Sequence, residues 1–117
     1  MATVMILHNP RCSTSRHAMS VAEGHDVEVV EYLKTPLDRD ALLGLISKLE
    51  DPAADLVRKD AFFQAQGLDE ADLSSADKVA DLLAEYPRLM QRPILVRGAR
   101  AIIGRPKQRV AEFLGAP

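Results

Sequence analysis

Cys12 is the residue of this chain best placed to do chemistry, and it is the sole cysteine among 117 residues. It follows a short apolar run and precedes three hydroxyl-bearing residues, which suit the start of a helix. A cysteine is a good nucleophile only as its thiolate, and a helix N-terminus and nearby cations both lower its pKa. Arg11 and Arg16 flank the thiol. A lone cysteine is otherwise often a small buried apolar residue, but these neighbours predict an activated thiol.

The start of the expected helix is also a candidate anion site. Backbone N–H groups in the first turn of a helix have no partner within the helix and attract anions. The candidate oxyanion contacts are the four residues after the cysteine: Ser13, Thr14, Ser15 and Arg16.

Arginines at three expected element boundaries are candidate partners for the thiol. They are Arg58, Arg92 and Arg105. A planar guanidinium binds a tetrahedral oxyanion through two parallel hydrogen bonds, so cysteine with several arginines points to nucleophilic chemistry on an oxyanion. The alternative for each is an ordinary solvated arginine, because arginine side chains are mostly exposed.

The histidines offer weaker candidates. His8 lies four residues before the cysteine and either tunes the thiol or packs at a strand end. The three histidines and one cysteine lack the ligand spacing of a zinc site. We therefore expect no metal and no bound cofactor.

Composition narrows the class of protein and its partners. The net charge is −2, which gives no global reason to expect nucleic-acid or membrane binding. No apolar run approaches the roughly 20 residues that span a bilayer. One cysteine excludes an internal disulfide, and a reactive free thiol is best preserved in a reducing compartment. We expect a cytoplasmic monomer.

The order of expected elements predicts one α/β domain. A strand at 3–7, a helix at 14–23 ended by Gly24 and a strand at 27–32 have the length of a parallel βαβ unit. Residues 38–87 are mainly helical in pattern, with Ser74 and Asp77 at capping-box spacing. A hairpin of strands at 93–96 and 100–103 precedes a last helix at 107–114.

Five segments resemble the glutaredoxin-linked arsenate reductase family, particularly its short, compact members. They are HNPRCSTSR at 8–16, YLKTP at 32–36, LVRK at 56–59, QRPI at 91–94 and IGRP at 103–106. The resemblance implies one thioredoxin-like domain over residues 1–117, with a mixed sheet flanked by helices and a helical insertion at about 38–87.

The resemblance also implies roles for single residues. Cys12 would attack arsenate, while the three boundary arginines would bind the anion and stabilise the intermediates. His8 matches a position thought to influence the thiol, and Pro93 matches a proline that is cis in thioredoxin-like folds. Ser15 replaces the second cysteine of a C-x-x-C pair, so the chain has no resolving thiol of its own.

The implied reaction therefore depends on outside thiols. Glutathione, as co-substrate, attacks the thiol–arsenate adduct, arsenic is reduced from As(V) to As(III), and glutaredoxin resolves the mixed disulfide. Two alternatives stay open. One is a glutathione-dependent thiol oxidoreductase acting on another substrate. The other is a non-catalytic regulator similar to the Spx proteins, which share this fold and bind RNA polymerase, although many of those carry the C-x-x-C switch that Ser15 removes.

Overall fold

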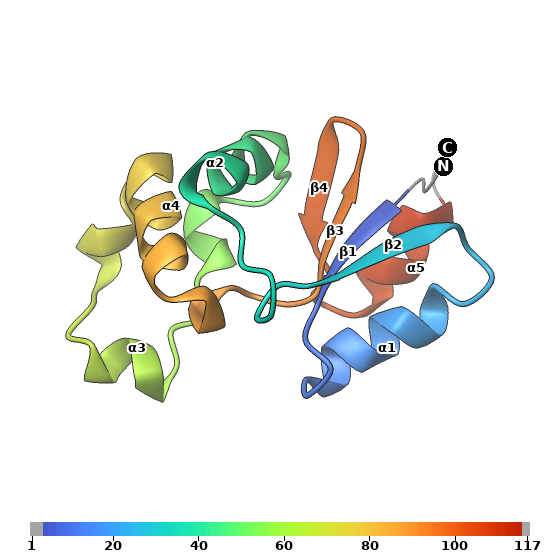
Figure 1. Ribbon diagram of the computed structural model, residues 1–117, viewed down its shortest axis with the longest axis horizontal. Coiled ribbons are helices and arrows are strands. Elements are labelled where there is room, and N and C mark those ends of the chain that lie inside the picture. Colours follow the sequence, from blue (N-terminus) through green and yellow to red (C-terminus); the bar gives the residue numbers. More distant parts are fainter. Residues whose placement is uncertain (1–3, 116–117) are drawn as a thin grey trace.

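A four-stranded mixed sheet forms the centre of the computed structural model, which describes residues 4–115 (Figure 1). In the order β2-β1-β3-β4, the first two strands are parallel and the other neighbours are antiparallel. The strands are β1 (Val4–His8), β2 (Val27–Glu31), β3 (Ile94–Arg97) and β4 (Arg100–Ile103). The expected βαβ unit and the expected hairpin are both confirmed.

Helices α1 (Ser13–Val21) and α5 (Gln108–Gly115) cover one face of the sheet (Figure 1). Apolar side chains from alternate positions of the strands meet them there. This cluster contains Val4, Ile6, Ala18, Leu95, Ile102, Val110 and Phe113. The intervening strand residues Leu7 and Ile94 belong to the cluster on the opposite face. Because the central strands are buried on both faces, they are nearly continuous apolar runs in the sequence.

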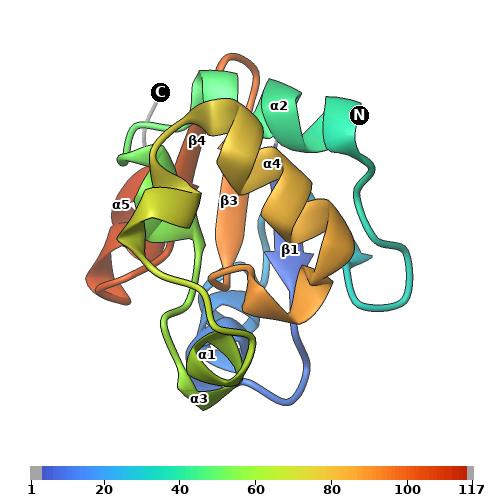
Figure 2. The same cartoon turned by 90° about the vertical axis from the view of Figure 1, so that its left-hand side faces the viewer.

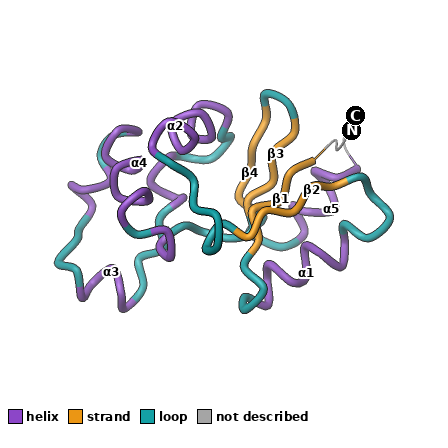
Figure 3. The backbone as a smooth tube through the Cα atoms, in the orientation of Figure 1, coloured by secondary structure: helices purple, strands orange, loops and turns teal. Residues whose placement is uncertain are grey.

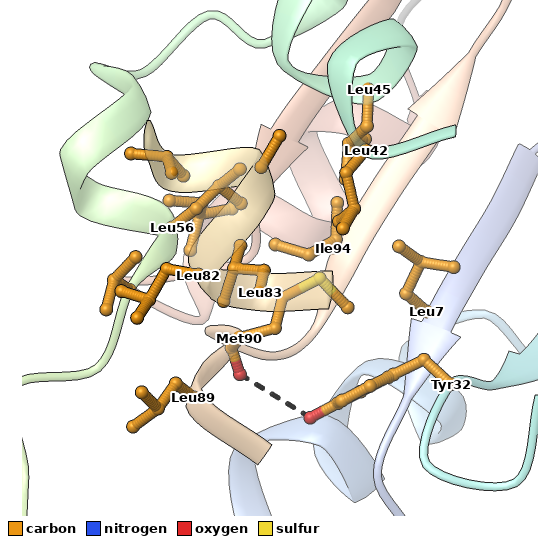
Figure 4. Close-up of a cluster of buried hydrophobic side chains, with 14 of the residues drawn as sticks. Leu7, Tyr32, Leu42, Leu45, Leu56, Leu82, Leu83, Leu89, Met90 and Ile94 are labelled. Carbon is orange, nitrogen blue, oxygen red and sulfur yellow. Dashed lines mark hydrogen bonds between the residues drawn. The ribbon is translucent and has the colours of Figure 1, made fainter. Parts of the chain in front are cut away.

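A helical insertion between β2 and β3 packs beside the opposite face, as the tube in Figure 3 and the turned view in Figure 2 show. Its elements are α2 (Arg39–Lys48), η1 (Ala53–Leu56), α3 (Ala61–Ala65), η2 (Glu70–Leu73), α4 (Ala76–Glu85) and η3 (Pro87–Leu89). Leucines of α2 and α4 share one buried cluster with Leu7 and Ile94 (Figure 4). On the surface, the Arg39 guanidinium donates to Asp77 at 2.8 Å and to Asp81 at 2.6 Å, which joins α2 to α4.

The start of α4 differs by one residue from the sequence prediction. Ser75, and not Ser74, is the N-cap, and its hydroxyl accepts from the Lys78 N–H at 3.2 Å. Ser74 has helical backbone angles because it ends the 3-10 helix η2. The reciprocal capping box occurs at the start of η2, between Asp69 and Asp72.

The start of β3 lies beside the C-terminal end of β1, the end that is followed by Cys12. The Arg92–Pro93 bond, expected to be cis, is cis, and so is Arg105–Pro106. Asp51 accepts from the Ile103 N–H at 3.0 Å and from the Arg109 side chain at 2.9 Å, which fixes the end of β4 to the insertion. Among residues 4–115, no helix is long and apolar enough to cross a membrane.

Candidate active site

Cys12 occupies the N-cap of α1, with extended backbone angles of φ −99° and ψ 125°. Its N–H donates to the Asn9 carbonyl at 3.0 Å, and its own carbonyl accepts from Arg16 N–H at 2.9 Å. The β1–α1 loop is therefore a closed turn that holds the sulfur over the first turn of the helix. The residue is 9% exposed, so the sulfur is sheltered but not sealed from solvent.

The surroundings of the sulfur favour the thiolate. Burial raises the pKa of Cys12, but a hydrogen bond from the Arg92 side chain, the backbone N–H groups of Ser15 and Thr14, and the charge of Arg92 lower it. The lowering effects win, and the pKa of Cys12 lies below its ordinary value. This is the expected effect of unpaired N–H groups at a helix start and a nearby guanidinium.

Arg92 and Arg105 meet at Cys12 although they are far from it in sequence. Arg105 Nη2 lies 3.4 Å from Cys12 Sγ, and Arg105 Nε donates to the Arg92 carbonyl at 2.8 Å. One guanidinium thus joins the thiol to the segment just before the cis Pro93. Arg92 Nε is buried, and within residues 4–115 it has no hydrogen-bond partner. That N–H is a candidate donor to an oxyanion.

Arg58 lies apart from this pair. Its guanidinium approaches Asp60 Oδ2 at 3.5 Å, and its backbone N–H donates to the Leu89 carbonyl at 2.7 Å. Within the described residues, its side-chain contact is therefore with Asp60 and not with Cys12. The backbone pairing nevertheless places Arg58 beside the segment that leads to Arg92.

Ser15 contributes to the site by packing inward. It is fully buried, and its hydroxyl accepts from the Asn9 N–H at 3.0 Å and bonds His8 Nδ1 at 2.7 Å. The hydroxyl is therefore occupied within the β1–α1 loop, while the Ser15 N–H faces the sulfur of Cys12. Burial lowers the pKa of His8, Glu31 raises it and Arg16 lowers it, with a net decrease. His8 is thus hydrogen-bonded to Ser15, the residue whose backbone N–H faces the sulfur.

Of the other candidate anion contacts, Thr14 faces the thiol, whereas Ser13 and Arg16 do not. The Thr14 N–H faces the sulfur, whereas Ser13 is exposed. Arg16 turns its guanidinium back onto the loop and donates to the Pro10 carbonyl at 2.9 Å. The first turn therefore presents backbone N–H groups to Cys12 and keeps the Arg16 cation outside.

Two residues at the site had no predicted role. Tyr32 is buried, and its hydroxyl donates to the Met90 carbonyl at 3.5 Å (Figure 4). Asn9 is also buried, and its side-chain oxygen accepts from the Arg11 N–H at 2.9 Å. Both stand in segments that carry the family resemblance, which is the only signal in the sequence that marks them.

A groove of about 390 Å³ is lined by Arg105 together with other polar side chains, including Lys59 and Gln91, and Cys12 is not among its lining residues. Within residues 4–115, no group of three or more histidine, cysteine or acidic side chains has the arrangement of a metal site. The local chemistry is therefore that of one thiol, with a lowered pKa, between guanidiniums and helix N–H groups.

Known proteins share this arrangement of elements. Residues 7–113 match the ArsC family. An arsenate reductase of Neisseria meningitidis is 38% identical over 118 residues, which cover 97% of this chain and 100% of that protein. One from Escherichia coli is 34% identical over 117 residues, which cover 97% of this chain and 82% of that protein.

A solved structure gives the same result in three dimensions. The arsenate reductase from Vibrio cholerae is 32% identical and superposes with a TM-score of 0.83, covering 97% of this chain and 100% of that chain. The match includes both halves of the sheet and the insertion between them, which confirms the thioredoxin-like fold. Since the family match runs from β1 through Cys12, Arg92 and Arg105 into α5, this chain belongs to the ArsC family.

Proposed function

We propose that this protein is an arsenate reductase that uses one cysteine and takes its electrons from glutathione and glutaredoxin. The observation that carries the proposal is the position of the Cys12 sulfur, which lies at the start of α1 with Arg105 at 3.4 Å and Arg92 hydrogen-bonded to it. The names of the relatives support arsenate as the oxyanion. The chain offers no second cysteine, so an outside thiol must complete each turnover.

Arsenate binding is the first role of the arginines. Arg92 and Arg105 bring two positive charges to the thiolate, and the unpaired Arg92 Nε–H provides a donor for an arsenate oxygen. Guanidiniums also offset the charge of the anion that the thiolate approaches. Arg58 takes part if the ion pair with Asp60, at 3.5 Å, opens when the anion binds.

The first chemical step joins sulfur to arsenic. The Cys12 thiolate attacks As(V), an S–As bond forms, and one arsenate oxygen takes up protons from solvent and leaves as water. The first-turn N–H groups of Thr14 and Ser15 lower the pKa of Cys12 in the free protein and so increase the share of the nucleophilic thiolate. No oxidation state changes in this step.

The second step moves two electrons to arsenic. The glutathione thiolate attacks Cys12 Sγ, the S–As bond breaks, and its electron pair stays on arsenic, which leaves as As(III). Cys12 remains in a disulfide with glutathione. A glutaredoxin thiol then attacks the glutathione sulfur and releases the Cys12 thiolate. Such exchanges require a reduced thiol pool, which suits the cytoplasm.

The test is NADPH consumption in the presence of arsenate, glutathione, glutaredoxin and glutathione reductase. We expect an arsenate-dependent rate and the appearance of arsenite with the natural chain, and neither with Cys12→Ser. The matched control Ser13→Ala changes an exposed neighbour of the nucleophile and should retain the rate.

The same assay separates arsenate from other substrates. Phosphate should give no NADPH consumption, because phosphorus is not reduced by thiols. A glutathionylated peptide offered in place of arsenate tests general disulfide exchange. Rapid turnover of the peptide with no arsenate-dependent rate would contradict the proposed substrate.

A further inference from the structure

Tyr32 connects parts of the site that are distant in sequence. It follows β2 directly and is only 1% exposed. Its hydroxyl donates to the carbonyl of Met90, 58 residues away, at 3.5 Å (Figure 4). Met90 stands two residues before Arg92, so the tyrosine contacts the segment that delivers a guanidinium to the thiol.

The backbone of this segment is paired on its other side. The Leu89 carbonyl accepts from the Arg58 N–H and the Leu56 carbonyl accepts from the Gln91 N–H, both at 2.7 Å. This pairing leaves the Met90 carbonyl pointing away from residues 56–58, as alternate groups do in an antiparallel pair. The hydroxyl of Tyr32 satisfies that carbonyl, and a buried carbonyl without a donor is costly.

The same hydroxyl faces the β1–α1 loop. Burial raises the pKa of Tyr32, while the charge of Arg92 and hydrogen bonds with the Asn9 and Arg92 side chains lower it, and the charge of Cys12 raises it. The phenol therefore lies among the amide of the cysteine loop, the guanidinium and the Met90 carbonyl. No other tyrosine lies here, because Tyr86 packs edge-on against Phe62 with ring centroids 5.6 Å apart.

We propose that Tyr32 is a positioning residue whose hydroxyl holds the segment from Met90 to Arg92 against the cysteine loop, and so keeps the Arg92 guanidinium on Cys12. The phenol does not touch the reacting atoms. It acts by fixing where one cation lies. The inference rests on Cys12 as the nucleophile of the proposed function but not on the identity of the substrate.

The experiment compares Tyr32→Phe with the matched control Tyr86→Phe. Cys12 is the sole cysteine, so the rate of alkylation by iodoacetamide against pH measures its pKa directly. In Tyr32→Phe, Arg105 and the first-turn N–H groups still face the sulfur but Arg92 is released, so the pKa of Cys12 should rise by about half a unit or more. Tyr86→Phe should leave the pKa of Cys12 unchanged.

A double variant tests the route of the effect. Arg92→Gln alone should raise the pKa of Cys12, and adding Tyr32→Phe to it should raise it no further, because the two changes act on one interaction. A merely structural Tyr32 would lower the unfolding temperature of Tyr32→Phe and leave the pKa of Cys12 as in the natural chain. That result would overturn the proposal.

A measurement on the unaltered chain covers the case in which Tyr32→Phe does not fold. With tyrosine labelled by ¹³C at Cζ, the Tyr32 resonance should shift at the pH where Cys12 ionises, and this shift should vanish in Cys12→Ser. A Tyr32 resonance that does not follow Cys12 would refute the inference. Neither readout uses arsenate, so a failure to reduce arsenate would contradict the proposed function and leave this result standing.

Discussion

Gly104→Ala should destabilise the protein because the backbone at Gly104 runs against the cis-proline segment. A methyl group at Gly104 would lie 2.8 Å from Pro93 Cγ, 3.0 Å from Val110 Cγ2 and 3.1 Å from Leu95 Cδ1. The Gly104 N–H also donates to the Pro93 carbonyl at 2.8 Å, so the backbone does not move away without losing that bond. Leu95 belongs to β3, Val110 belongs to α5 and Pro93 directly precedes β3, so little room is left for relaxation.

The magnitude follows from the number and kind of these contacts. Adding a methyl group to a closely packed core costs about 1–3 kcal/mol. For a chain of 117 residues, 1 kcal/mol corresponds to about 4 °C in unfolding temperature. We therefore expect Gly104→Ala to lower the unfolding temperature by about 4–12 °C.

Gly44→Ala is the matched control, because it makes the same change where space is free. Gly44 lies inside α2 and is exposed, and beyond its chain neighbours and the backbone of its own helix no heavy atom lies within 4 Å of an added Cβ. Alanine is more favourable than glycine inside a helix by about 1 kcal/mol, so this variant should gain about 4 °C. Thermal unfolding followed by circular dichroism compares the two.

The opposite signs make the comparison decisive. An unfolding temperature of Gly104→Ala equal to or above that of the natural chain would refute the steric reasoning. The displaced proline ring also adjoins Arg92, so the alkylation rate of Cys12 gives a second readout on the same variant.

Three further predictions concern the site. Arg92→Lys should slow arsenate reduction about tenfold or more in the coupled assay, because lysine lacks the planar fork, whereas Arg88→Lys, stacked on an aromatic ring elsewhere, should not. Ser15→Ala should lower the unfolding free energy by about 1–3 kcal/mol in urea titrations, because it removes the acceptor of a buried N–H, and exposed Ser13→Ala should change it by less than about 0.5 kcal/mol. In the folded protein the pKa of His8 lies below its ordinary value of 6.5, so as the pH falls the unfolded chain binds a proton at this histidine first. The stability contributed by His8 should therefore be complete above pH 6.5 and lost as the pH falls through the lowered pKa. His8→Gln should flatten this dependence of stability on pH in unfolding curves.

Each of these has a result that contradicts it. Equal rates for Arg92→Lys and the natural chain would remove Arg92 from the anion site. Equal unfolding free energies for Ser15→Ala and Ser13→Ala would show that the buried hydroxyl contributes nothing. An unfolding temperature that falls with acid equally in His8→Gln would assign the loss to other groups.

The order of the elements could be predicted because each carries a local signal. Asp38 caps α2 by accepting from the Ala41 N–H at 2.8 Å, and Gly24 takes the positive φ of 87° that ends the first helical segment. Apolar runs mark the two central strands. The N-cap of α4 was predicted one residue too early because Ser74 and Ser75 are adjacent. Only the preceding 3-10 helix, which ends at Ser74, shows that Ser75 is the cap.

The contacts that make the site lie beyond such local signals. Arg105 meets Cys12 across 93 residues, and neither spacing nor periodicity fixes that meeting. Arg16 is adjacent in sequence yet turns to the Pro10 carbonyl. Their positions at element boundaries made Arg58, Arg92 and Arg105 candidates, and the family resemblance assigned all three to the anion. The structure brings Arg92 and Arg105 to Cys12, whereas the side chain of Arg58 contacts Asp60.

The buried position of Ser15 could have been predicted. It is spaced with Ala18 and Ala22 at i, i+3 and i+7, and all three are buried. Helical periodicity therefore places the Ser15 hydroxyl on the core side of α1. Its hydroxyl made Ser15 a candidate anion contact, but its position on the core side of the helix predicts its burial correctly.

The single sulfur makes the covalent state of this protein unusually easy to interpret. Since Cys12 is the sole cysteine of the chain, every disulfide that the protein forms contains exactly one outside thiol or a second copy of the chain. The intact mass of a trapped disulfide therefore identifies the molecule that last reacted with it. Intact-mass spectrometry can therefore identify partners without proteolytic cleavage and without assigning which sulfur was modified.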